Sequence, residues 1–270
     1  MQPRDDYFGV MKNIVLTGGA SGIGAASVSR LLKQNCQVII LDTTEPVLES
    51  RLASFIFTDL SSSTSIDAAI KQLPKKIDGL INVAGISGAH SADKVIAVNF
   101  LGLRYLTEAL FTRLSGGCVV NVASSAGRDW LVRKELVNKL LNTNSFSDGL
   151  AWVDSHMSEI EANPYKFSKQ CAAAYTYRAT GLGMACSVRV NCVNPGVVGT
   201  QLTADFKDML GADLYDWVVK QIGREGRPDD IAQIIEFLSI GESYWLNGVE
   251  IAVDGGYTAG IIDGWIKPPK

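Results

Sequence analysis

Seven short apolar runs recur along the chain, and each is nearly continuous rather than alternating with polar residues. They are rich in Val, Ile and Leu, and longer stretches separate them. The runs cover residues 13–16, 37–41, 54–57, 79–83, 118–123, 187–193 and 249–253. Strands that are covered on both faces have this continuous apolar character, as in parallel sheets. The pattern therefore predicts a mostly parallel, seven-stranded sheet.

The stretches between these runs carry a helical period of apolar residues. The clearest cover residues 25–34, 65–73, 95–114, 165–182 and 229–238. Strands that alternate with helices indicate βαβ units, and right-handed crossovers place helices on both faces of a doubly wound sheet. The serine-rich residues 61–65 are expected to form a loop that ends at a helix N-cap.

No internal repeat and no Pro- or Gly-rich linker divides the chain. We therefore expect one α/β domain over residues 12–270, preceded by an N-terminal extension at residues 1–11. Hydrophobic residues make up 47% of the chain and charged residues 20%, which is enough for a sizeable core.

The formal net charge of −3 gives no reason to expect nucleic acid or an anionic membrane as a partner. No apolar run approaches the roughly 18 residues of a spanning helix, and the first residues lack a signal-peptide pattern. The five cysteines form no C-x-x-C pair, as expected for reduced, buried thiols in a cytoplasmic protein. The two histidines cannot build a His-rich site alone, so no metal is expected.

A glycine-rich turn, Thr17-Gly-Gly-Ala-Ser-Gly-Ile-Gly24, directly follows the first predicted strand. Glycines at 18, 22 and 24 allow a tight turn and a close approach to a pyrophosphate. The next helix would offer that phosphate its free amides and the positive end of its dipole. Between a strand and a helix the turn indicates a dinucleotide site, although a turn without a ligand is the alternative.

Asp42 ends the second predicted strand. A carboxylate at this place accepts hydrogen bonds from both hydroxyls of an adenosine ribose and repels a 2′-phosphate. The following Thr43 and Thr44 supply no cation. We therefore predict NAD rather than NADP as cofactor. The alternative role of Asp42 is that of a helix cap or turn residue.

Tyr165 and Lys169 lie four residues apart and so share one face of a helix. An ammonium beside a phenol favours the phenolate, which would prepare the tyrosine for proton transfer. Asn163 and Pro164 precede the pair as an N-cap and a first helical residue. Alone, such a pair is more often an ordinary surface feature.

Eight segments in order resemble the short-chain dehydrogenase/reductase family, over about residues 12–256. They are residues 17–24, 59–60, 82–85, 98–102, 121–124, 165–169, 194–200 and 253–256. Val83 departs from the pattern, because the family often has a second asparagine there. The resemblance implies a single-domain Rossmann fold and an NAD-dependent oxidoreductase that acts on CH–OH groups.

The resemblance also implies roles for four residues. Tyr165 would be the general acid or base, and Lys169 would lower the pKa of Tyr165 and bind the nicotinamide ribose. Ser124 would bind the substrate oxygen, and Asn99 would hold a water on a proton path. The expected cofactor-binding residues are Gly18, Ser21, Gly22, Ile23, Gly24, Asp42, Asp59, Leu60, Asn82, Ala84, Gly85, Tyr165, Lys169, Pro195, Gly196, Val198 and Thr200.

Ser124 and Tyr165 are 41 residues apart, roughly 28 more than the family usually has and too many for an ordinary loop. Residues 130–141 and 148–160 each have an amphipathic helical pattern, and residues 142–145 form a loop between them. We therefore expect a helical insert over residues 128–163. It could cover the substrate pocket, alter the face through which a homo-oligomer (dimer or tetramer) forms, or only pack on the surface.

An insert of this length at this place resembles the subgroup that includes bacterial 3α-hydroxysteroid dehydrogenase/carbonyl reductase and coniferyl alcohol dehydrogenase. We expect a secondary alcohol or ketone as substrate, bulky and apolar like a hydroxysteroid. Candidates for its apolar wall are Trp130, Leu131, Trp152 and Phe206, and residues 201–223 are expected to form a mobile lid. The alternatives are an aryl or allyl alcohol dehydrogenase and a non-catalytic NAD-binding sensor.

Overall fold

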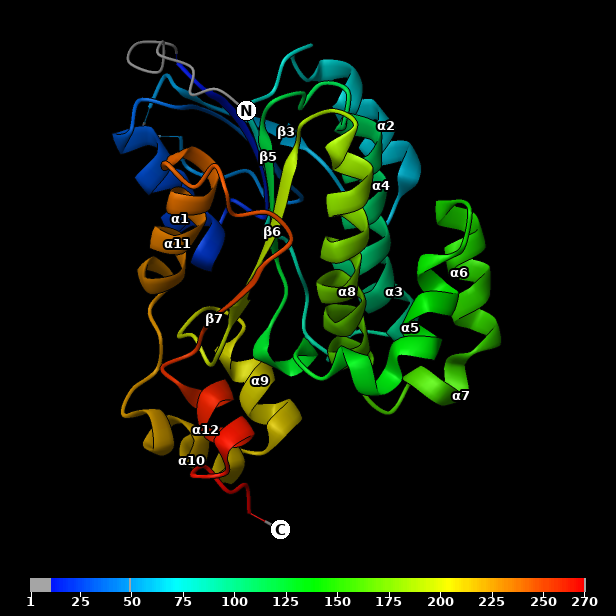
Figure 1. Cartoon of the computed structure of the whole chain (residues 1–270), viewed down its shortest axis with the longest axis vertical. Coiled ribbons are helices and arrows are strands. Elements are labelled where there is room, and N and C mark those ends of the chain that lie inside the picture. Colours follow the sequence, from blue (N-terminus) through cyan, green and yellow to red (C-terminus); the bar gives the residue numbers. More distant parts are fainter. Residues whose placement is uncertain (1–10, 49, 270) are drawn as a thin grey trace.

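The computed structural model describes residues 11–48 and 50–269, so the predicted N-terminal extension lies outside the described residues except for Met11. Its centre is a parallel sheet of seven strands in the order β3-β2-β1-β4-β5-β6-β7 (Figure 1). The strands are β1 (Asn13–Thr17), β2 (Gln37–Asp42), β3 (Ala53–Phe57), β4 (Gly79–Asn82), β5 (Cys118–Val122), β6 (Arg189–Pro195) and β7 (Glu250–Val253). All seven predicted strands are confirmed, and the fold is the expected Rossmann-like one.

Helices cover both faces of the sheet (Figure 1). On one face lie α1 (Gly22–Lys33) and α11 (Pro228–Ile240), and on the other lie α2 (Ser63–Gln72), α4 (Leu103–Leu110) and α8 (Pro164–Met184). The predicted helix over residues 95–114 is interrupted. The short α3 (Ala92–Ile96) passes into a π-helical segment, η1 (Ala97–Gly102), before α4 begins.

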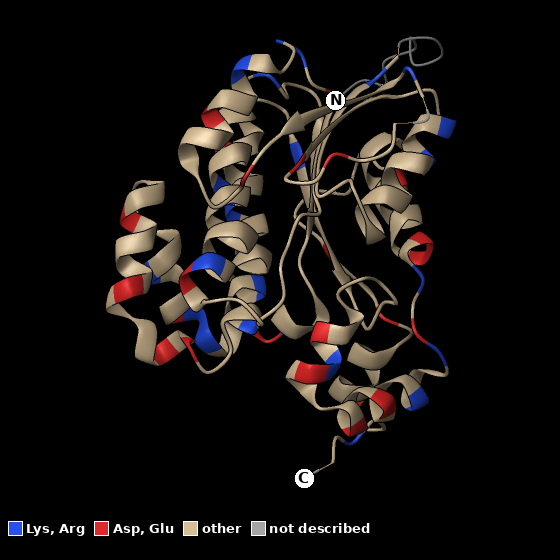
Figure 2. Ribbon diagram, turned by 180° about the vertical axis from the view of Figure 1, so that it is seen from behind, with Lys and Arg blue, Asp and Glu red and all other residues tan. Residues whose placement is uncertain are grey.

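Alternate strand residues enter two separate cores. Val15 and Leu41 pack in the cluster under α4 and α8, whereas Leu16 and Ile40 pack in the cluster under α1 and α11. Charged residues within the strands occur only at strand ends, at Asp42, Arg189 and Glu250, and most charged positions in Figure 2 lie on helices and loops. Burial on both faces explains the continuous apolar runs of the sequence.

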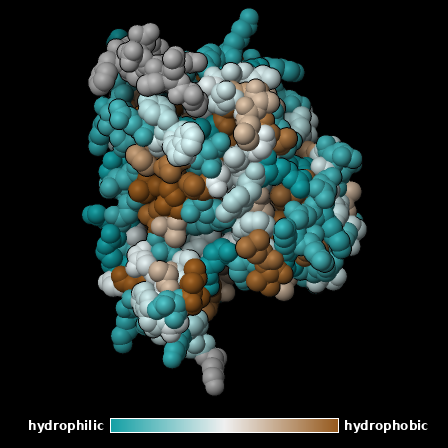
Figure 3. All heavy atoms as spheres, in the orientation of Figure 1, coloured by the Kyte–Doolittle hydropathy of each residue, from teal (hydrophilic) through white to brown (hydrophobic). Residues whose placement is uncertain are grey.

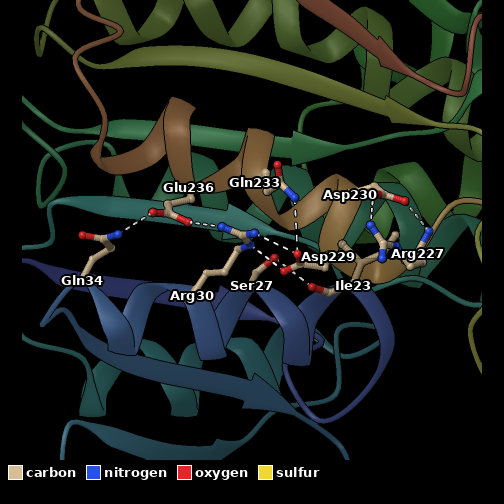
Figure 4. Close-up of polar contacts among 9 residues, drawn as sticks. All are labelled: Ile23, Ser27, Arg30, Gln34, Arg227, Asp229, Asp230, Gln233 and Glu236. Atoms are coloured by element: carbon tan, nitrogen blue, oxygen red, sulfur yellow. Dashed lines mark hydrogen bonds and ion pairs between the residues drawn. The ribbon is translucent and has the colours of Figure 1, made fainter.

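The α1–α11 pair is joined by an ion-pair network (Figure 4). The Arg30 guanidinium on α1 donates to both oxygens of Asp229, at 2.6 and 2.8 Å, and to Glu236 at 2.9 Å. Gln34 donates to the other oxygen of Glu236 at 2.8 Å. These contacts raise the pKa of Arg30. The two-pronged geometry fixes the position of α1, whose N-terminus follows the glycine-rich turn.

The insert is helical on both sides of the predicted loop, as expected, but each of the two predicted helices is divided into two segments. It comprises η3 (Trp130–Arg133), α5 (Lys134–Leu141), α6 (Phe146–Ser155) and α7 (Met157–Ile160), and Figure 1 shows it outside α8. Val137, Leu140, Val153 and Ile160 are fully or almost fully buried in the core cluster of that face. The insert is therefore an integral part of the core.

Arg104 of α4 holds the insert in place and is only 4% exposed. Its guanidinium donates to the carbonyl of Leu140 (3.3 Å), the hydroxyl of Thr143 (3.1 Å) and the carbonyl of Ser145 (3.2 Å). Burial lowers the pKa of Arg104. The last carbonyls of a helix have no hydrogen-bond donor within the helix. Arg104 supplies one to the end of α5 and to the loop that follows it.

Three further helices gather beyond the carboxyl ends of the strands, at the lower end of the molecule in Figure 1. They are α9 (Thr203–Leu210), α10 (Ala212–Ile222) and α12 (Tyr257–Asp263). Figure 3 shows apolar surface on both sides of the junction between these helices and the body. None of the helices in the described part of the chain has the length and apolar character needed to cross a membrane.

Candidate functional site

A cavity of about 810 Å³ lies at the carboxyl ends of the strands. It opens where β1 and β4 lie side by side while their connections run to opposite sides of the sheet, which is where open α/β sheets bind ligands. Most of the predicted site residues line it: Gly18, Ser21, Gly22, Ile23, Gly24, Asp42, Asp59, Leu60, Ala84, Gly85, Ser124, Tyr165, Lys169, Pro195, Gly196, Val198 and Thr200.

The glycine-rich turn has the backbone that a phosphate cradle needs. Gly18 has a φ of +74°, and a Cβ there would come within 2.6 Å of Ala84. A Cβ at Gly24 would come within 1.9 Å of the Gly18 carbonyl oxygen. The N-cap Ser21 makes no side-chain bond to the first amides of α1. The turn and the helix start therefore fit a pyrophosphate through free backbone N–H groups.

Asp42 lies at the end of β2 on the cavity wall. Its carboxylate accepts hydrogen bonds from the backbone amides of Ala20 and Thr44, each at 3.0 Å. Asp42 thus fixes the glycine-rich turn, as the turn-residue alternative anticipates, and it still faces the cavity. A carboxylate on this wall suits the diol of an adenosine ribose.

Two predicted site residues do not line the cavity. The Asn82 side chain faces the interior and donates to Thr107 (3.0 Å) and to Asn121 (2.9 Å). Asn99, in the π-helical segment, accepts from the Ile86 amide at 2.8 Å and donates to the Ile86 carbonyl at 3.0 Å. Asn82 joins β4 to the buried Thr107 and Asn121, and Asn99 holds the wall segment after β4 in place. Both residues therefore support the cavity wall without lining it.

The predicted reaction centre comes together on β5 and α8. Asn163 caps α8 by accepting from the Lys166 amide at 2.9 Å, and Pro164 occupies its first turn, as expected. Tyr165 is 9% exposed and Ser124 is 8% exposed. The Lys169 ammonium donates to the Val122 carbonyl at 3.0 Å and lies 5.8 Å from the centre of the Tyr165 ring.

Burial governs the proton affinities of this centre. It raises the pKa of Tyr165 to about 12, while the Ser124 hydroxyl acts in the opposite direction. Burial also lowers the pKa of Lys169 to about 8. The predicted lowering of the Tyr165 pKa by Lys169 is not seen in this structure, where desolvation is the largest cause of the shift and Ser124 opposes it.

The segment after β6 closes the cavity opposite the glycine-rich turn. A Cβ at Gly196 would come within 2.7 Å of Asp254, whose carboxylate accepts from the amides of Gly256 (3.0 Å) and Thr258 (2.9 Å). The Thr200 side chain faces Gly22 across the cavity, since a Cβ on Gly22 would lie 3.3 Å from it. Both ends of the wall are thus fixed by close backbone contacts.

The apolar wall differs from the expected one. Phe206 lines the cavity and packs edge-on against Tyr165, with ring centres 5.1 Å apart. Trp130, Leu131 and Trp152 of the insert do not line it. Residues of the predicted lid supply the wall instead: Gln201, Leu202, Phe206, Met209, Leu210, Leu214, Tyr215, Val218 and Ile222.

The insert tryptophans are engaged elsewhere. The Trp130 indole donates to Glu250 at 3.0 Å, and the Trp152 ring stacks on His156, with ring centres 4.1 Å apart. Among the insert residues 128–163, only Arg128 and Asn163, at its two ends, line the cavity. The body of the insert therefore packs on α8 from outside the cavity.

Sequence reasoning did not find several lining residues: His90, Arg128, Tyr257 and Pro268. Each stands in a loop or at a helix start, where no periodic pattern marks it. Within residues 11–48 and 50–269, no group of three or more His, Cys, Asp or Glu side chains is placed to hold a metal ion.

A family model described as Enoyl-(Acyl carrier protein) reductase matches residues 18–258. Coniferyl-alcohol dehydrogenase of Pseudomonas sp. (strain HR199 / DSM 7063) is 40% identical over 247 residues, which cover 91% of this chain and 96% of that protein. 2-(S)-hydroxypropyl-CoM dehydrogenase 3 of Xanthobacter autotrophicus is 30% identical. That match covers 91% of this chain and 96% of the Xanthobacter protein.

A solved structure of 3-alpha-hydroxysteroid dehydrogenase from Pseudomonas sp. B-0831, complexed with NADH, superposes with a TM-score of 0.77. It is 25% identical, and the match covers 95% of this chain and all of that one. Both the sequence matches and the structural match thus span nearly the whole chain.

The buried Lys169 ammonium predicts a pH-dependent stability. Its folded pKa of about 8 lies below the ordinary lysine pKa of 10.5, so the unfolded chain binds more protons between these pH values and stability rises with pH. The free energy of unfolding of the parent protein should rise between pH 7 and pH 10 by about 2 kcal/mol relative to Lys169→Met. Urea unfolding of both proteins at each pH measures this. Parallel pH profiles would contradict it.

Proposed function

The chain belongs to the short-chain dehydrogenase/reductase family, and we propose that it transfers a hydride between NAD(H) and a ring-bearing aryl or allyl alcohol or its carbonyl counterpart. The observation that carries the proposal is the gathering of Ser124, Tyr165 and Lys169 around one cavity with the glycine-rich turn. The family supports oxidoreductase chemistry on alcohols and ketones. The 40% identity to a coniferyl-alcohol dehydrogenase supports the aryl or allyl class.

The cofactor would be held by the start of α1 and by Asp42, with Asp59 and Leu60 beside its adenine. Pro195, Gly196, Val198 and Thr200 stand opposite, on the nicotinamide side of the cavity. When bound, the nicotinamide supplies the hydride chemistry, and the protein positions and polarises the substrate. The place of the glycine-rich turn on the cavity wall and the uncapped amides at the start of α1 support a dinucleotide rather than an empty turn.

Three side chains of this chain would then move and hold the proton. Ser124 orients the substrate oxygen and steadies its developing negative charge. The Tyr165 hydroxyl donates its proton to that oxygen in reduction, and its phenolate takes the proton in oxidation. Lys169 binds the ribose beside Tyr165, and its ammonium favours the phenolate when the reaction requires it. The predicted water on the proton path from Lys169 would lie beside the wall segment that Asn99 shapes, because the Asn99 amide is itself engaged by Ile86 and Ser168.

A bulky apolar alcohol such as a hydroxysteroid is the second candidate substrate. It is favoured by the cavity of about 810 Å³ and by the likeness to a 3-alpha-hydroxysteroid dehydrogenase structure. Physiologically, we expect a homo-oligomer in the cytoplasm, as the family resemblance and the cysteine usage suggest.

A substrate panel separates the two candidates. We expect NADH formation with coniferyl-type alcohols at a kcat/KM at least about tenfold above that with hydroxysteroids, which is roughly the effect of one or two kcal/mol of pocket complementarity. Absorbance of NADH at fixed enzyme concentration measures it. Turnover of steroids with none of aryl or allyl alcohols would reverse the order of the candidates.

Tyr165→Phe removes the proposed proton donor while keeping the ring. Turnover should fall about 10³-fold or more, because general acid–base catalysis supplies that order of rate, while NADH should still bind, as read by its fluorescence. Tyr177→Phe, the same change on the exposed face of α8, should keep turnover within a few-fold. A Tyr165→Phe enzyme with parental turnover would rule out the mechanism, whereas a parental protein that binds NADH but turns over no substrate would fit a non-catalytic sensor.

Asp42→Asn tests the choice of cofactor. The amide keeps one acceptor oxygen for the turn but loses the charge that repels a 2′-phosphate, so the ratio of kcat/KM for NAD over NADP should fall about tenfold or more. Asp78→Asn is the matched control, because Asp78 accepts from the Asn13 amide at the opposite end of the sheet. A parental preference for NADP would overturn the assignment.

A further inference from the structure

Carboxylates occur at only one end of the cavity wall. Asp42 and Asp59, which follow β2 and β3, are the only acidic residues that line it among those described. On the side of β5 and α8, where Ser124 and Tyr165 lie, the charged wall residues are Arg128, Lys166 and Lys169. The substrate end is therefore purely cationic.

Two of these three cations are already engaged. Lys169 donates to the Val122 carbonyl at 3.0 Å. Lys166 forms an ion pair with Asp129 at 2.6 Å, and the other Asp129 oxygen accepts from Gln170 at 2.8 Å. Within the described part of the chain, no ion pair includes Arg128. The Arg128 charge helps to lower the pKa of the neighbouring Asp129 carboxylate, but Asp129 forms its ion pair with Lys166 and does not line the cavity.

Arg128 is nevertheless held in position from two sides. Its Nη1 donates to the Ser125 carbonyl at 2.9 Å, and its guanidinium lies 5.7 Å from the centre of the Tyr257 ring. Ser125 belongs to the segment after β5, whereas Tyr257 begins α12, so the contact joins two walls. A guanidinium fixed in this way loses little entropy when its remaining N–H groups bind a ligand.

We propose that Arg128, backed by the Tyr257 ring, binds an acceptor oxygen at the far end of a ring-sized substrate, either a carboxylate or a phenolic oxygen. The proposal rests on the proposed function and deepens it. Arg128 contacts the residue next to Ser124, so its guanidinium lies within about two residue lengths, roughly 8 Å, of the group that orients the reacting oxygen. One six-membered ring with short substituents spans such a distance.

Both acceptors suit this guanidinium. A carboxylate receives two parallel N–H bonds from an arginine, and a phenolic oxygen receives one. The ring of the substrate would lie between Arg128 and the apolar wall from Phe206 to Ile222. Arg128 thus selects among alcohols by their far end, while Ser124 and Tyr165 act on the near end.

The test compares substrates that differ only at the far end. One pair is 4-hydroxycinnamyl alcohol and cinnamyl alcohol, and the other is cis-4-hydroxycyclohexanecarboxylate and cyclohexanol. Arg128→Met should raise KM about tenfold or more for the oxygen-bearing member of at least one pair, which is the worth of one charge-assisted bond. KM for the bare member and kcat for both should stay within about threefold.

The pair with the larger change identifies the acceptor. For a carboxylate substrate, the KM of Arg128→Lys should lie between the KM of the parent and that of Arg128→Met. Lysine keeps the charge but loses the two-pronged geometry. Arg133→Met is the matched control. It removes a positive charge five residues further on, outside the cavity wall, and should leave the KM of all four substrates unchanged.

Three outcomes would overturn the proposal. An equal rise of KM for both members of a pair means that Arg128 only supports the wall. Unchanged KM values for both pairs mean that Arg128 binds no substrate oxygen. If the parental enzyme oxidises none of these alcohols or any other in the panel, the proposed function fails and the subsite fails with it, whereas turnover without far-end discrimination leaves the proposed function intact.

Discussion

The parallel hydrogen-bonded sheet is the constraint on which the rest of the structure depends. Because all seven strands run the same way, their carboxyl ends meet at one edge, and segments far apart in the chain are brought together there. The turn after β1, the segment after β5 and the loop after β6 reach one cavity for this reason alone. Parallel strands also require cover on both faces, which assigns α1 and α11 to one side and α4 and α8 to the other.

Burial in this frame gives the reaction centre its chemistry. Tyr165 and Lys169 are held on a helix whose inner face has almost no water, so each is driven toward its neutral form. With a pKa of about 12 for Tyr165 and about 8 for Lys169, the phenol holds its proton until further interactions favour the phenolate. The hydroxyl of Ser124 already acts in that direction. Placement in the core thus prepares the site as much as the identity of the residues does.

Features that depend on local geometry were predictable from the sequence, and those that depend on distant packing were not. Gly18 and Gly24 must be glycines for steric reasons, and Asn163 with Pro164 starts a helix by its own hydrogen bonds, so these positions were found. Asn82 belongs to the predicted cofactor segment at residues 82–85. Its side-chain amide instead donates to Thr107 and Asn121 on other elements. Trp130 is apolar enough for a pocket wall, yet Glu250, 120 residues away, holds its indole. Tyr257 and Arg128 lie far apart in the sequence, and their contact on the cavity wall forms only in the folded chain.

The guanidinium of Arg104 makes the insert and the core mutually dependent. Its partners are the carbonyls and hydroxyl at the end of α5 and in the loop before α6, and it has almost no access to solvent. A chain from which residues 128–163 were excised would keep a cation in a cavity stripped of acceptors, at a cost of several kcal/mol. The residue at position 104 and the insert are therefore coupled: a chain without residues 128–163 would need an uncharged side chain at position 104 to keep this part of the core stable.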